Sequence, residues 1–252
     1  MEEFALFQRH VNAIHAAARI VIATRRSAAH WPNLTLTDAG DEGWRVAFSE
    51  PVILWDAPIR ASTSSGAAAK RAIVMDGSFY FKNGTFDKGG ASLEIYSIAR
   101  SHHRCGLKLL DAMHFDIEPH SRQTPFHPMF HVQSGKNNRW DIAQLQSCVA
   151  SLARVANDKV DIDRDLNTPT RDLRIPTPQM DYLSMLVMVI ADCFCEKNST
   201  HEVQSGFKNL LRKVMDSKNT ARNGRQSRRL EQRWADPVAY PFCASHWYEE
   251  SC

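Results

Sequence analysis

Residues 109–133 contain four side chains whose types and spacing could do chemistry: His114, Asp116, His127 and His131. His114 and Asp116 alternate with apolar residues at the two-residue period of a β-strand, and His127 and His131 do the same in a second run. Turn-forming residues fill the gap at 118–125. Two such strands, paired antiparallel with their apolar faces inward, would carry all four polar side chains on one surface.

These residue types allow two kinds of chemistry. His114, Asp116, His127 and His131 are candidate acid and base catalysts for phosphodiester cleavage, and His114, Asp116 and His131 are candidate ligands of a divalent metal ion. The alternative is structural, with the histidines making hydrogen bonds beside Pro128 and lining a polar sheet face. No HExxH signature decides between them, so whether the chain is an enzyme stays open.

Other familiar types of site do not fit the pattern. A nuclease of the PD-(D/E)xK type would use Asp76 and Glu94, but the lysine that should follow Glu94 is missing. A Ser/His/Asp hydrolase lacks its GxSxG elbow. The six cysteines form no CxxC pair, so neither a zinc knuckle nor a disulfide framework is indicated, and a reducing cytosol is expected. Cys193 and Cys195 are predicted to be packing residues of a buried helix.

A second set of residues suits binding rather than catalysis. Between residues 201 and 235, nine Lys or Arg stand against three Asp or Glu, so 9 − 3 gives +6, whereas the whole chain carries +3. Arginines bind phosphate through bidentate geometry, and tryptophan stacks on bases. An acidic protein partner is the other interpretation. The predicted nucleic-acid-binding residues are Arg222, Arg225, Arg228, Arg229, Arg233 and Trp234.

The elements that must position these residues follow from periodicity. Residues 2–25 have the spacing of an amphipathic helix, and residues 44–48 alternate as a strand. From 71 to 100, β-prone runs are separated by turn signals, of which Asn83-Gly84 is the strongest hairpin signal. We expect an antiparallel meander here that leads into the 109–133 pair.

Three helices are predicted after the sheet. Residues 139–157 have an apolar stripe that starts at Ile142, and a polar connection follows at 158–172. The second helix is expected to begin with Thr177 as N-cap and Pro178 as its first residue, with Asp181 at its positive end. It is apolar nearly all round, as a buried core helix would be. The third helix covers 202–218.

The expected architecture is an α+β fold. An antiparallel sheet of about five to seven strands, at about residues 44–133, is packed by the N-terminal helix and by the C-terminal helices. Residues 1–200 are expected to form the core domain, and 201–252 a basic helical extension with an aromatic tail. The start of the chain lacks a signal-peptide pattern, and the apolar run at 183–190 is too short to cross a bilayer. We therefore expect a cytoplasmic protein without a membrane partner.

Three short motifs add a resemblance: HFD at 114–116, HPxxH at 127–131 and RIPT at 174–177, the last followed by a long apolar helix. Together they resemble a family of uncharacterised bacterial proteins, classed as a domain of unknown function, that sit among mobile-element and phage-defence genes. The resemblance covers residues 90–195 and assigns no catalytic residues. It implies a prokaryotic cytosolic protein with a role in defence. Together with the basic segment, this favours a nucleic-acid-engaging component of a phage-defence or mobile-element assembly. The alternative, which follows from the histidine cluster, is a metal- or histidine-dependent hydrolase, foremost a nuclease.

Overall fold

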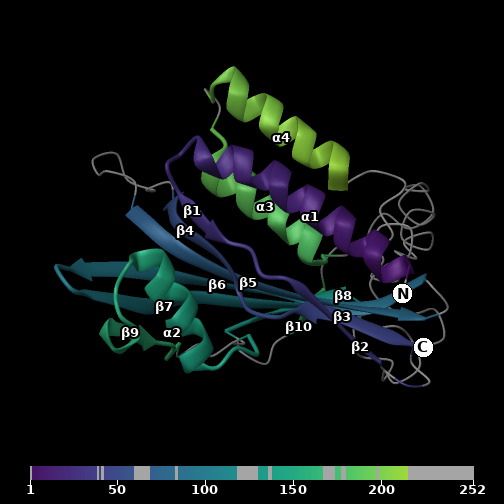
Figure 1. The fold of residues 1–252 in the computed structure, drawn as a ribbon, viewed down its shortest axis with the longest axis horizontal. Coiled ribbons are helices and arrows are strands. Elements are labelled where there is room, and N and C mark those ends of the chain that lie inside the picture. Colours follow the sequence, from purple (N-terminus) through teal and green to yellow (C-terminus); the bar gives the residue numbers. More distant parts are fainter. Residues whose placement is uncertain are drawn as a thin grey trace.

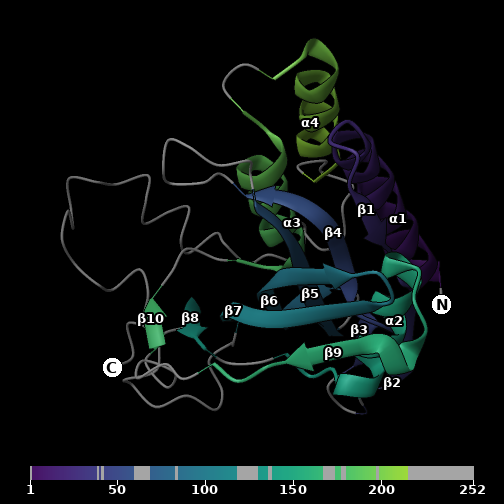
Figure 2. The same cartoon turned by 90° about the vertical axis from the view of Figure 1, so that its left-hand side faces the viewer.

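The computed structural model describes residues 2–38, 40, 43–59, 69–82, 85–117, 130–135, 138–166, 174–176, 180–196 and 199–214. Its centre is a ten-stranded sheet with helices on both faces (Figures 1 and 2). The α+β prediction is confirmed. The helices are α1 (Glu2–Ala23), α2 (Ile142–Ala153), α3 (Tyr182–Phe194) and α4 (His201–Val214), with a short 3-10 turn, η3, at Asn157–Lys159. The strands are β1 (Ala28–His30), β2 (Leu34–Asp38), β3 (Trp44–Phe48), β4 (Val52–Ile59), β5 (Ala69–Lys82), β6 (Thr85–Ser101), β7 (Arg104–Ile117), β8 (Phe130–Ser134), β9 (Val160–Asp163) and β10 (Arg174–Pro176).

The strands follow the order β1-β4-β5-β6-β7-β8-β10, with β3 joining β2 to β5 and β9 lying beside β7. The predicted meander is confirmed, because β5, β6 and β7 are consecutive antiparallel neighbours and Lys82 pairs with Thr85 across the predicted hairpin. The predicted range of 44–133 is too narrow, because β1 and β2 precede it and β9 and β10 follow it. Within the described sheet, the pairing of β9 with β7 is the parallel one.

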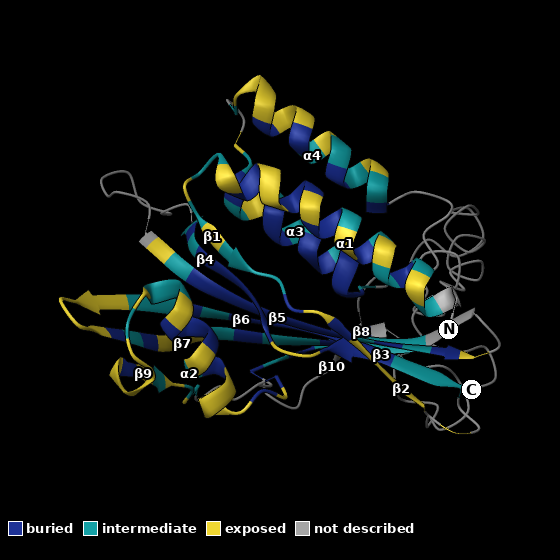
Figure 3. Cartoon of the chain, viewed as in Figure 1, coloured by how far each residue is buried: buried dark blue, intermediate teal, exposed yellow. Residues whose placement is uncertain are grey.

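Each face of the sheet carries an apolar core of its own, and Figure 3 shows buried residues on the strands and on the helices that cover them. Leu54, Ile73 and Met75 belong to the cluster formed with α1, α3 and α4. Ile53 and Val74, one residue away along the same strands, belong to the cluster formed with α2. Since successive side chains of a strand point to opposite faces, β4 and β5 are apolar at consecutive positions where both faces are covered by helices.

Two predictions about helices are wrong: the N-cap of α3 and the first residue of the buried stripe of α2. The N-cap of α3 is Asp181, whose side chain accepts a hydrogen bond from the Ser184 backbone N–H at 2.9 Å, so the helix starts after Thr177 and Pro178. In α2, Ile142 is 48% exposed, because the buried stripe starts one turn later at Leu145. The prediction of α3 as a buried core helix holds along most of its length. No helix in the described ranges has the length and apolarity needed to cross a membrane.

Candidate functional site

The sheet face that α2 covers is apolar at one end and polar at the other. Antiparallel register places residues of β5, β6 and β7 in rows that share a face. The first row, Val74, Glu94 and Ala112, borders the α2 core; the next two are Asp76–Ser92–His114 and Ser78–Gly90–Asp116. The two-residue period of each strand thus continues from the core into a patch of polar side chains.

His114, Asp116 and His131 come together at the edge of this patch. The Nε2 atom of His114 lies 2.8 Å from Asp116 Oδ1, and the Nε2 atom of His131 lies 3.4 Å from Asp116 Oδ2. The β7–β8 register explains the meeting, since Asp116 pairs directly with His131. His131 is 1% exposed, whereas His114 and Asp116 are half-buried. Three of the four residues predicted to share a surface therefore do so, and His127 lies outside the described residues.

The second ring nitrogen of His114 makes no hydrogen bond in the described part of the chain. Nδ1 is buried and has no hydrogen-bond partner among the described residues, while Nε2 faces the Asp116 carboxylate. A carboxylate holds the proton on the nitrogen it contacts, so this pairing leaves the lone pair on Nδ1. Gly90 makes room for the pair, because a Cβ at that position would lie 3.3 Å from Asp116 Oδ1 and 3.8 Å from His114 Cε1.

His114 lines a pocket of about 260 Å³, called here the polar pocket. Two cations flank it. Arg139 is ion-paired with Asp76, at 2.7 Å from Nε to Oδ2, and donates a hydrogen bond to the Phe48 carbonyl. Arg45 lies over the Tyr80 ring at 5.4 Å, and its Nε has no hydrogen-bond partner in the described part of the chain. The lining residues are Arg45, Asp76, Gly77, Ser78, Gly90, Ala91, Ser92, His114, Asn138 and Arg139.

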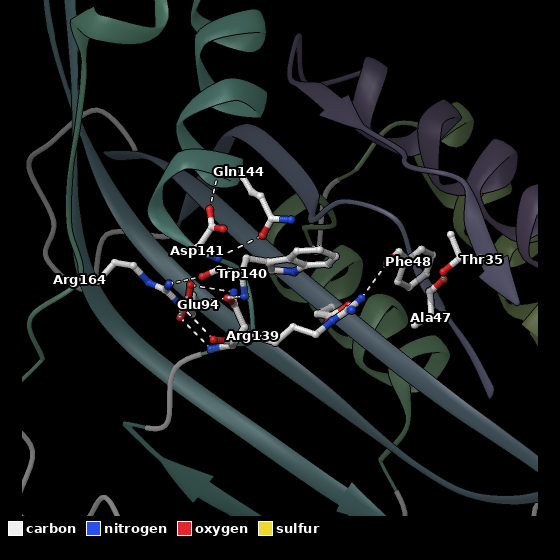
Figure 4. Close-up of polar contacts among 11 residues, drawn as sticks. Thr35, Ala47, Phe48, Glu94, Arg139, Trp140, Asp141, Gln144 and Arg164 are labelled. Carbon is white, nitrogen blue, oxygen red and sulfur yellow. Dashed lines mark hydrogen bonds and ion pairs between the residues drawn. The ribbon is translucent and has the colours of Figure 1, made fainter. Parts of the chain in front are cut away.

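A buried network of Glu94 holds the segment that carries Asn138 and Arg139 (Figure 4). The carboxylate is 0% exposed and accepts from Asn138 on both oxygens, from Tyr96 at 2.6 Å and from Arg164 at 2.6 Å. Burial first, and then the Glu94 charge, raises the pKa of Tyr96 well above its ordinary value of 10, so its hydroxyl remains a donor. Glu94 thus anchors the backbone that begins α2 and presents Arg139 to the pocket.

Several residues of the polar pocket are not predicted by the sequence patterns. The sequence patterns use Asp76 only as part of a nuclease motif that lacks its lysine. Arg139 lies in the range predicted as a helix, but α2 begins three residues later, at Ile142. Ser92, Arg45 and Asn138 belong to no predicted site. One signal is present: the residues that face α2 change from apolar to polar at Asp76 in β5 and at Glu94 in β6.

The metal-ligand arrangement of the described chain lies elsewhere. Among the described residues, the group whose ligand atoms all lie within 4.8 Å of one another is His30, Glu50 and Cys148. Asp116 meets its two histidines through different oxygens, with a hydrogen bond to His114 and a 3.4 Å contact with His131. Metal binding by His114, Asp116 and His131 therefore stays a prediction.

The described cysteines are free thiols, of which Cys105 and Cys148 are buried. Cys193 and Cys195 are half-buried on or next to α3 and pack against the core shared with α1, as a packing role requires. Burial, followed by the Asp192 charge, raises the pKa of Cys193 to about 11, so its thiol stays protonated near neutral pH.

The predicted nucleic-acid-binding residues Arg222, Arg225, Arg228, Arg229, Arg233 and Trp234 lie outside the described residues. Of the preceding basic segment, α4 carries the exposed Lys208 and Arg212. Comparison of the chain with protein-family models, with curated proteins and with solved structures finds no match.

Proposed function

We propose that the chain is a phosphodiester hydrolase acting on nucleic acid, with His114 as the group that moves the proton. One observation carries the proposal: a histidine held at Nε2 by a carboxylate lines a pocket flanked by two arginines, with Nδ1 free of any hydrogen bond in the described chain. This arrangement combines a base with cations that suit an anionic phosphate.

The residues have distinct parts in the proposed reaction. Water attacks phosphorus while His114 Nδ1 takes its proton, the bond from phosphorus to the leaving oxygen breaks, and the proton passes to that oxygen. Arg45 and Arg139 balance the charge on the non-bridging oxygens. Asp116 is a positioning residue, since it orients the ring and stabilises the imidazolium, and His131 holds the other carboxylate oxygen.

The test is cleavage of labelled single-stranded and double-stranded RNA and DNA, with and without divalent ions. His114→Gln should lower kcat by about 10² to 10⁴, the usual range for a general acid or base. Asp116→Asn should lower kcat by a similar factor and leave KM nearly unchanged, because it acts through His114 and not on the substrate. His103→Gln, on the exposed turn between β6 and β7, is the matched control and should retain wild-type rates. Folded wild-type protein that cleaves none of these substrates would rule the hydrolase out.

A second function is favoured by charge alone. The excess of +6 between residues 201 and 235 supports a protein that engages nucleic acid without cutting it. The two functions are compatible, because one segment of a chain can hold a nucleic acid while a different site of the same chain cleaves it. The resemblance of residues 90–195 to a bacterial family found among defence and mobile-element genes supports a place in such an assembly in the cytoplasm.

A further inference from the structure

His30, Glu50 and Cys148 form a cluster on the face of the sheet covered by α2. His30 is the last residue of β1, Glu50 lies in the turn between β3 and β4, and Cys148 lies in the middle of α2. His30 pairs with Ile53, which belongs to the apolar cluster that includes Cys148. Three segments far apart in the sequence thus bring one nitrogen, one oxygen and one sulfur donor together.

The ligand atoms are close enough for one ion. All three lie within 4.8 Å of one another, and His30 Nε2 is 3.0 Å from Glu50 Oε2. Zinc bonds of about 2.0 Å to nitrogen and oxygen and 2.3 Å to sulfur put tetrahedral ligands roughly 3.3 to 3.5 Å apart. Small rotamer changes would bring the three ligand atoms from their present separations of up to 4.8 Å to the tetrahedral spacing. His30 and Glu50 have room to make them, because their side chains are 30% and 52% exposed.

We propose that His30, Glu50 and Cys148 bind a zinc ion that joins α2 to the end of β1 and to the β3–β4 turn. The set of ligands selects this class of ion, because zinc accepts imidazole, carboxylate and thiolate, whereas magnesium and calcium prefer oxygen. A thiolate and a carboxylate together neutralise the dication. Three protein ligands leave a fourth position for water on the exposed side.

The site is separate from the polar pocket but bears on it. α2 follows directly on the segment of Asn138 and Arg139, which the Glu94 network fixes at its other end. An ion bound to Cys148 would fix the middle of the same helix. Since such an ion binds the folded chain in preference to the unfolded one, it should raise the temperature of unfolding, by an amount that grows with the logarithm of its affinity.

The experiment is a cobalt titration of chelator-treated protein under a thiol-sparing reductant, with Co²⁺ standing in for Zn²⁺. Wild-type protein should bind one ion per chain, show a sulfur-to-cobalt charge-transfer band, and release the cobalt to an equivalent of Zn²⁺. Cys148→Ser should abolish the band. Cys105→Ser, a buried cysteine of the same apolar cluster, is the matched control and should keep the band.

Glu50→Gln tests the same site with a variant that is expected to fold even if Cys148→Ser does not, because it alters an exposed side chain in a turn. It should leave the circular dichroism unchanged and weaken Co²⁺ binding at least about tenfold. The proposal is overturned if wild-type protein gives no thiolate band at one equivalent of Co²⁺. A band that survives Cys148→Ser, or a folded Glu50→Gln chain with wild-type affinity, would overturn it equally.

Discussion

At the scale of single residues, His15 is a histidine whose burial dictates its protonation. It lies in α1, donates or accepts a 2.8 Å hydrogen bond with the Tyr182 hydroxyl, and stacks near Trp31 and Phe48. Burial first, and then the Arg19 charge, lowers the pKa of His15 from 6.5 to about 3. His15 is therefore neutral in the folded protein at pH 5, where it is largely protonated in the unfolded chain.

This difference makes a prediction for stability against pH. The unfolded chain binds one more proton than the folded one between pH 6.5 and about 3, so stability falls as pH is lowered through this window and is fully present above it. The loss approaches about 1.4 kcal/mol per pH unit at most. His15→Gln keeps a polar partner for Tyr182 but does not titrate. Urea unfolding at pH 7, 6, 5 and 4 should show a shallower decline for this variant than for wild type, whereas His103→Gln should match wild type. If the free energy of unfolding declined equally with pH in all three proteins, His15 would not be a source of the pH dependence.

At the scale of elements, periodicity predicts the helices and strands whose bounds depend on local sequence. Strand β3 and helix α1 have nearly their predicted bounds, because each has an uninterrupted alternation or stripe. The sequence predicts a connection in place of β9, because the outward residues Asp161 and Asp163 are charged and the pairing with β7 is a long-range parallel contact. The predicted start of α3 is misplaced because threonine and aspartate are both residue types that cap helices. In the structure the cap is Asp181 and not the predicted Thr177, and Tyr182, which follows it, is buried in the core.

The packing of α3 on β5 gives the element-scale prediction. A Cβ on Gly77 would lie 2.6 Å from Cβ of Tyr182, an atom too close to the backbone of α3 to rotate away. Gly77→Ala should therefore destabilise the fold by about 1 to 3 kcal/mol through overpacking. Gly106→Ala in β7 is the matched control, since its nearest neighbour would be Ala99 Cβ at 3.7 Å. This control should be neutral or slightly stabilising, because alanine costs less entropy in a strand than glycine. Chemical denaturation measures both, and equal stabilities would show that α3 can shift on the sheet.

At the scale of the whole molecule, the candidate site divides into a local part and a long-range part. His114, Asp116 and His131 can be grouped from sequence because strand period and one antiparallel pairing decide their faces. Arg45 and Arg139 cannot, since the first reaches the polar pocket from β3 and the second from the segment anchored by Glu94. Such contacts depend on how the strands and the helix assemble, which no short pattern encodes.

The charge of the whole molecule gives the last prediction. If the excess of +6 at residues 201–235 binds phosphate, replacing Arg225, Arg228, Arg229 and Arg233 with Gln should weaken binding to RNA or DNA. The plot of log affinity against log salt should become shallower by about one unit for each phosphate group that the variant no longer binds. The matched control removes the same charge elsewhere, by replacing the exposed Arg9, Lys82, Lys108 and Arg154 with Gln.

Fluorescence anisotropy of labelled oligonucleotides across a salt series separates the outcomes. Local phosphate binding predicts that the tail variant has a shallower slope while the charge-matched control keeps the wild-type slope, because screening limits distant charges to about 10 Å at ordinary ionic strength. Equal reductions in both variants would mean that net charge, and not the tail, attracts nucleic acid. Wild-type protein without affinity at low salt would assign the basic segment to an acidic protein partner, since clustered arginines pair with carboxylates through the same bidentate geometry that they use for phosphate.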